Sequence, residues 1–213
     1  ALERTMECNI LVKQKFEGPI LDIGCGEGLF AHLLFDEKID VGIDPNEKEL
    51  ARAKDFNMYN ELLCCLGNKI PKENKTFNTI FSNSVLEHIR DIEPVLNEAH
   101  RLLADNGNFY VTLPTNLFDQ YSVINQLLIN LGLNKSASGF RNFFNRFWRH
   151  YHYYDEKGWR ELFERNGFSV LDSIQYCTKT ACLKNDFLVP FTLPGFLIKK
   201  LFNRWTLFPV LRP

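Results

Sequence analysis

Three glycines at alternate positions, Gly24, Gly26 and Gly28, are the residues of this 213-residue chain best placed for chemistry. They follow the short apolar run 19–23 and precede a second one, 29–35, which predicts a strand, a tight turn and a helix. Because glycine has no side chain, a ligand can approach the backbone N–H groups of such a turn at the helix N-terminus. The pattern indicates a loop that binds a ligand through its main chain, the alternative being a glycine-rich turn without a ligand.

Asp44 is the second residue of interest, because it ends the next predicted strand, 40–43. A carboxylate at that place in a β-α-β unit reaches the ribose of a nucleotide that lies across the first loop. The dinucleotide fingerprint has two residues between its second and third glycines, whereas here one residue separates them. The spacing therefore favours an adenosine-containing ligand other than a nicotinamide cofactor.

The segment Asp22-x-Gly24-x-Gly26-x-Gly28 resembles motif I of the class I S-adenosylmethionine-dependent methyltransferases. Within that superfamily, the chain resembles the methyltransferase type 11 group. The resemblance implies an enzyme of class EC 2.1.1.- that uses S-adenosyl-L-methionine and releases S-adenosyl-L-homocysteine. It also implies that the loop passes under the methionine part of the cofactor, with Asp22 near the ammonium group. The residues expected to bind the cofactor are Asp22, Gly24, Cys25, Gly26, Gly28, Asp44, Pro45, Leu66, Gly67, Asn83 and Ser84.

Two positions depart from the family pattern. The acid that often follows the third strand and binds adenine is replaced by Leu66-Gly67-Asn68, so backbone groups or Asn68 would have to recognise the base. The acid usual in the fourth strand is replaced by Asn78. These departures support a competing interpretation, a binding or scaffold protein that keeps the fold without turnover.

The predicted elements alternate between strands and helices, which is typical of a parallel sheet covered on both faces. Strands are expected at 19–23, 40–43, 61–66, 77–82, 108–113 and 168–176, and helices at 2–16, 47–56, 92–103 and 155–166. The resulting fold class is α/β, a Rossmann-like, doubly wound, seven-stranded and mostly parallel sheet with helices on both faces. Residues 1–186 would form this domain.

A helical insertion is expected at 115–154, after the fifth strand and over the carboxyl ends of the sheet. It would contain a helix at 117–133, a break at 136–139 and an aromatic, arginine-bearing stretch at 140–154. Such an insertion fits a lid that excludes water and holds the acceptor. The alternative is that these residues form an aromatic core with a solvated basic face. Nucleic-acid binding is a weaker option, because the net charge of the chain is only −1.

Methyl transfer from a sulfonium group needs a base only where the acceptor must lose a proton. The candidates for that base are His88, His150, His152 and Tyr153, and His88 fits a packing role equally well. Six cysteines without a Cys-x-x-Cys pair lead us to expect no metal site. The expected acceptor is a small molecule, anionic or lipid-linked, of a sugar or quinone type.

The C-terminal stretch 187–213 combines bases with bulky apolar residues and predicts a short helix at about 196–205. It fits packing on the core or on a second subunit, or contact with a membrane surface. No secretory signal begins the chain and no apolar run has the length of a membrane span, so the expected location is cytoplasmic or peripheral to a membrane.

Overall fold

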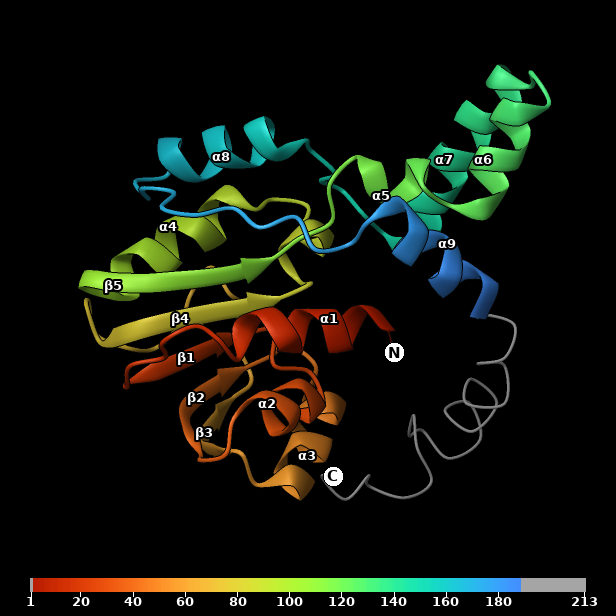
Figure 1. Ribbon diagram of the computed structural model, residues 1–213. Helices are drawn as coiled ribbons and strands as arrows, with labels where there is room; N and C mark the ends of the chain where they lie inside the picture. Colours follow the sequence, from red (N-terminus) through yellow and green to blue (C-terminus); the bar gives the residue numbers. More distant parts are fainter. Residues whose placement is uncertain (1, 189–213) are drawn as a thin grey trace.

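The computed structural model describes residues 2–188. Its centre is a parallel sheet of five strands in the order β3-β2-β1-β4-β5 (Figure 1). The strands are β1 Ile20–Ile23, β2 Ile39–Ile43, β3 Tyr59–Leu63, β4 Phe77–Asn83 and β5 Leu103–Thr112. The α/β Rossmann-like class is confirmed, but the expected count of seven strands is wrong for the part of the chain that is described.

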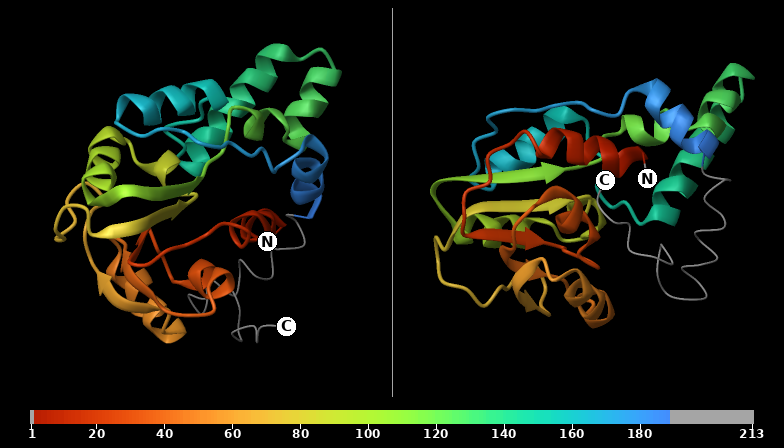
Figure 2. Two further views of the ribbon diagram at one scale, coloured as in Figure 1. Left: turned by 60° about the vertical axis from the view of Figure 1, so that its left-hand side comes forward. Right: turned by 60° about the horizontal axis from the view of Figure 1, so that its bottom comes forward.

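The two central strands carry almost only buried residues, as expected of strands covered on both faces. One face of the sheet packs against α4 (Glu93–Leu102) and α8 (Glu156–Arg165) through Leu96, Leu162 and Phe163. The other packs against α2 (Leu29–Leu34) and α3 (Glu47–Phe56) through Ala31 and Ala53. Figure 2 shows these helices on opposite sides of the sheet.

The helix boundaries follow local capping signals. Asn46 caps α3 by accepting a hydrogen bond from the Lys48 N–H, and Asp155 caps α8 in the same way with Gly158. The first helix, α1 (Leu2–Leu11), is shorter than expected. Residues 105–107, which separate the predicted helix 92–103 from the predicted strand 108–113, lie within β5.

The predicted strand at 168–176 is wrong, because the structure has no regular secondary structure there. Its alternating apolar residues predict a strand, but Leu171 is 84% exposed and Ile174 is also exposed. The segment instead joins α8 to α9 (Lys179–Leu188) without entering the sheet. Pairing with a sheet edge requires tertiary docking that periodicity alone does not specify.

Three helices form the segment between β5 and α8: α5 (Leu117–Gln120), α6 (Val123–Asn130) and α7 (Asn134–Trp148). The single helix expected at 117–133 is divided because the Ser122 side chain caps a new helix by accepting from the Asn125 N–H. The break expected at 136–139 is also wrong, since these residues lie inside α7. Figure 1 shows α6 and α7 projecting away from the sheet.

The helix expected at 196–205 lies outside the described residues. Among residues 2–188, no helix combines the length and the apolar character needed to cross a bilayer.

Candidate active site

The glycine turn leaves β1 and enters α2 through three residues with positive φ. Gly24, Gly26 and Gly28 have φ values of 81°, 53° and 78°, a region that side chains disfavour. The N–H groups of Gly24 and Cys25 both donate to the Ile43 carbonyl at 2.9 Å, which fixes the turn to the end of β2. A Cβ on Gly24 would lie 2.5 Å from Val85 Cγ2, so this position has no room for a side chain.

Asp44 lies directly against this turn. Its Oδ2 accepts a hydrogen bond from the Gly26 N–H at 3.0 Å, and its Oδ1 accepts from the Asn46 N–H at 2.8 Å. A Cβ built on Gly26 would have no heavy atom within 4 Å, so the turn is open on that side. The structure thus brings the glycine turn and the Asp44 carboxylate together at the carboxyl ends of β1 and β2.

Asp22, which the resemblance implies lies near the ammonium group of the cofactor, is a buried residue of β1. It is 3% exposed and accepts a hydrogen bond from the Tyr59 hydroxyl at 2.8 Å. Burial is the main cause that raises the pKa of this carboxyl to about 7; the Tyr59 hydrogen bond opposes the shift and the nearby Asp44 adds to it. The buried Asp22 side chain therefore connects β1 to β3 across the intervening strand β2.

The other residues expected to bind the cofactor differ in how far they are buried. Cys25 is buried, Pro45 is exposed and Leu66 is 61% exposed. Gly67 lies close to α4, since a Cβ there would be 3.1 Å from Val95 Cγ1. Asn68, the alternative partner for the adenine, is exposed.

Asn83 and Ser84, at the end of β4, contact a carboxylate that the sequence analysis missed. Glu7 of α1 is fully buried, and its Oε2 accepts from Asn83 Nδ2 while its Oε1 accepts from the Ser84 hydroxyl, each at 3.0 Å. Tyr176 donates to the same Oε1 at 3.0 Å, and Arg4 forms a 3.0 Å ion pair with Oε2. Amphipathic periodicity predicts α1, but nothing in it distinguishes Glu7 from an exposed acid.

A narrow cleft lies beside this network, and its free volume of about 10 Å³ has room for about one water molecule. Residues of α1, the helical segment and α9 line it, including Met6, Phe118, Phe144 and Cys182. Two carboxyl groups, Glu3 and Asp186, also line it, and burial raises the pKa of both. The lining of the cleft therefore combines apolar side chains with two carboxyl groups.

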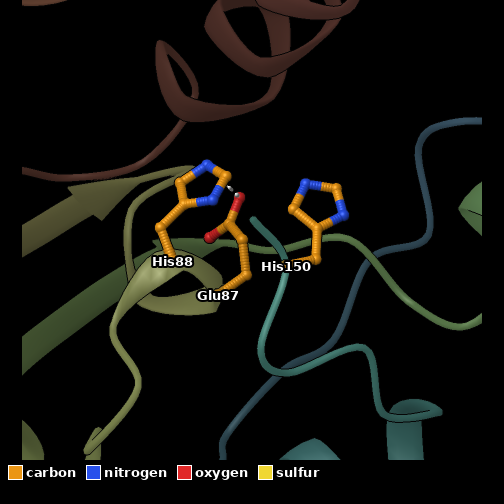
Figure 3. Close-up of side chains that lie close together, drawn as sticks. All are labelled: Glu87, His88 and His150. Atoms are coloured by element: carbon orange, nitrogen blue, oxygen red, sulfur yellow. Dashed lines mark ion pairs between the residues drawn. The ribbon is translucent and has the colours of Figure 1, made fainter. Parts of the chain in front are cut away.

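Two of the four residues predicted as candidate general bases lie close together at the end of β4. His88, from the short 3-10 helix η1 (Leu86–His88), and His150, after α7, have ring centroids 5.2 Å apart. Glu87 lies between them (Figure 3). Partial burial lowers the pKa of His88. Burial, with a contribution from His88, lowers the pKa of His150 to about 4, so the His150 ring is neutral at physiological pH.

The remaining two candidates are placed differently. His152 Nε2 lies 2.9 Å from the Ile89 carbonyl and its Nδ1 lies 3.1 Å from the Tyr154 hydroxyl, so both ring nitrogens have partners inside the protein. Tyr153 is 43% exposed.

Among the arginines of the predicted insertion, Arg141 donates to Asn125 Oδ1 at 3.0 Å and to Ser138 Oγ at 3.1 Å, within the helical segment itself.

The sheet order, the glycine turn and the carboxylate at the end of β2 together define a Rossmann-like protein with a nucleoside-binding edge. A family described as a methyltransferase domain matches residues 9–173. The chain belongs to this family, and S-adenosyl-L-methionine is the cofactor of its class I superfamily.

Individual relatives cover the chain only in part. A putative methyltransferase of Bacillus subtilis, YrhH, is 32% identical over 51% of this chain and 64% of its own length. A ubiquinone biosynthesis O-methyltransferase of Pelagibacter ubique is 32% identical over 43% of this chain and 40% of its own length. The chain thus spans less than two thirds of either relative.

A solved structure from Thermotoga maritima, described as a methyltransferase and possible histamine N-methyltransferase, superposes with a TM-score of 0.59. It is 21% identical and covers 79% of this chain and 72% of its own. At that identity the likeness concerns the fold alone.

Proposed function

We propose that this protein transfers a methyl group from S-adenosyl-L-methionine to a small lipid-linked acceptor, of which a quinone-type or sugar-bearing intermediate is an example. The observation that carries the cofactor half of the proposal is the contact between the Gly26 N–H and the Asp44 carboxylate. The open side of Gly26 would face the methionine part of the cofactor, and Asp44 would accept hydrogen bonds from its ribose.

The cleft beside Glu7 supports the choice of acceptor. The apolar side chains that line it would suit an isoprenoid or aromatic group once the helical segment moves outward to make room, whereas the Glu3 and Asp186 carboxyls would repel an anion. We therefore favour the lipid-linked acceptor over an anionic one. A relative acts in ubiquinone biosynthesis according to its name, which is consistent with this class of substrate.

The residues around the cleft would contribute mainly by positioning. The sulfonium methyl is already activated, so the rate depends on in-line placement of the acceptor and on exclusion of water. For a hydroxyl acceptor, a neutral His88 or His150 is available to take the proton, since both have lowered pKa values. His152 would instead fix the segment after α7, because both its nitrogens already have partners.

Calorimetry with S-adenosyl-L-methionine tests the cofactor site through a matched pair of glycine substitutions. Gly26→Ala and Gly132→Ala both place a side chain at a positive φ, and neither Cβ would have a heavy atom within 4 Å. Both should lose about 1 kcal/mol of stability. Only Gly26→Ala should weaken cofactor binding, by about tenfold or more, which corresponds to the loss of about 1.4 kcal/mol at the binding surface.

Equal cofactor binding by the two variants would contradict the proposed site. Cofactor binding by the wild type without methyl transfer to any quinol, phenol or polyprenyl-linked sugar would favour the competing scaffold function. The departures at Leu66 and Asn78 support that competing function. In this structure Asn78 Nδ2 donates to the Gly18 carbonyl at 2.7 Å, which is a structural role.

We also propose, as an extension of the same function, that the enzyme contacts a membrane surface to reach its acceptor. The supporting observation is a set of exposed apolar side chains on and next to α6, namely Val123, Ile124, Leu127, Ile129, Leu131 and Leu133. Exposed apolar surface of this extent often marks an interaction site. The stretch 187–213, for which membrane contact is one alternative beside packing on the core or on a second subunit, lies mostly outside the described residues.

A further inference from the structure

The structure brings three potential metal ligands together from two distant parts of the chain. Glu87 and His88 belong to η1 at the end of β4, and His150 follows α7. One ligand atom from each residue lies within 4.8 Å of the other two. In Figure 3 the Glu87 carboxylate points between the two imidazole rings.

Glu87 is the unusual member of this group. It is 2% exposed, and its Oε2 has no hydrogen-bond partner within residues 2–188. Its Oε1 lies 3.8 Å from His88 Nε2. A buried carboxylate oxygen without a partner is costly, and a bound cation would remove that cost.

Both imidazoles are oriented as metal ligands usually are. His88 Nδ1 lies 3.3 Å from the Arg149 carbonyl, which accepts a hydrogen bond only if that nitrogen carries the proton. His150 Nδ1 lies 3.3 Å from Asn145 Oδ1. The Nε2 lone pair of each ring is therefore directed away from these partners and is available to a metal.

The side chains of Asn145 and Asp119 fix this tautomer at His150. Asn145 Nδ2 donates to Asp119 Oδ2 at 2.6 Å, so the amide oxygen of Asn145 faces His150 as an acceptor. Both Asn145 and Asp119 are buried. Such carboxylate-supported contacts behind a histidine are characteristic of metal sites.

We propose that Glu87, His88 and His150 bind a divalent transition-metal ion, with Zn²⁺ as the probe, and that the ion ties the helical segment between β5 and α8 to the end of β4. Two imidazoles and one carboxylate suit Zn²⁺ and similar ions and leave a coordination position open. The backbone already joins the two parts, since the Tyr151 N–H donates to the Glu87 carbonyl at 2.8 Å. Small side-chain rotations would bring the three ligand atoms to the roughly 3.4 Å separations of a tetrahedral site.

This site uses the two histidines that we offer above as proton acceptors, so an ion bound to them would exclude that role. Its test nevertheless needs no cofactor or acceptor. Zn²⁺ titration of the full chain by calorimetry should give one site in the wild type. His88→Asn and His150→Asn should each weaken Zn²⁺ binding at least tenfold. His88→Asn serves as the second variant because His88 is exposed, so its loss should leave the fold intact.

Two control variants distinguish this site from other zinc ligands. His100→Asn removes an exposed histidine elsewhere, and Cys182→Ser removes one of two thiols whose sulfurs lie 3.2 Å apart. Both should keep the wild-type affinity within about twofold. Three results would overturn the proposal. They are no Zn²⁺ binding by the wild type, unchanged Zn²⁺ binding by both His88→Asn and His150→Asn, and loss of Zn²⁺ binding by Cys182→Ser.

Discussion

At the scale of single residues, the environment decides what a motif residue does. Asp22 and Asp44 both belong to the motif that predicts a nucleoside site, and both are acids at or near strand ends. The first is buried against Tyr59, while the second accepts two backbone hydrogen bonds at the open side of the glycine turn. Asp22 thus has its partner inside the protein, whereas Asp44 lies at the open side of the turn where we propose that the cofactor binds.

The raised pKa of Asp22 predicts a pH-dependent change in stability. A carboxyl with a pKa of about 7 in the folded state and about 3.9 in the unfolded state binds its proton more tightly when folded. The wild type should therefore lose stability as the pH rises from about 4 to about 7, and the loss should stay constant above that range.

Asp22→Asn removes this titration and keeps an acceptor for the Tyr59 hydroxyl. Relative to the wild type, it should gain about 2–4 kcal/mol in the free energy of unfolding between pH 4 and pH 7. Urea unfolding at a series of pH values measures the difference. An exposed control, Asp91→Asn, should follow the wild-type curve; a pH-independent difference for Asp22→Asn would contradict the prediction.

At the scale of elements, α1 is held to the carboxyl end of β4 by one buried acid. Glu7 accepts hydrogen bonds from Asn83, Ser84 and Tyr176 and pairs with Arg4. These contacts connect the start of the chain, the end of β4 and the segment that follows α8. Glu7 thus joins α1 to the end of β4 and to the segment that precedes α9.

Replacement of Glu7 should separate these elements. Glu7→Gln puts an amide NH₂ among hydrogen-bond donors, which leaves buried groups without acceptors and should cost about 2–4 kcal/mol of stability. Thermal unfolding of the variant measures this loss. The exposed acid Glu37, replaced in the same way, should change stability by less than about 0.5 kcal/mol; an equal loss in both variants would exclude the proposed role of Glu7.

At the scale of the whole molecule, the helical segment between β5 and α8 has two sides with different properties. Its inner side is internally bonded, as shown by the Asp119 to Asn145 contact and by the Phe118 and Phe144 rings, 5.7 Å apart. Its outer side, around α6, is apolar and exposed. The exposed outer side is the part of the segment that we propose contacts a lipid surface.

Vesicle sedimentation tests the membrane contact with the full chain. Replacing both Leu127 and Leu131 by Ser should reduce the fraction bound to vesicles at least about fivefold, because each buried leucine contributes about 1.5–3 kcal/mol. The matched control replaces Leu33 and Leu171, which are also exposed but lie elsewhere. A wild type that stays in the supernatant, or an equal loss in the control, would remove this part of the proposal.

The sequence by itself determined the sheet class, the glycine turn and Asp44, because strand and helix periodicity and the conformational freedom of glycine are local properties. It also indicated the insertion by position, although it placed its helix boundaries wrongly and predicted a strand at 168–176. Only the tertiary structure decided that Asp22 is buried, that Glu7 binds Asn83 and Ser84, and that Glu87, His88 and His150 meet. These facts depend on contacts between segments far apart in the chain, which no local pattern of residues encodes.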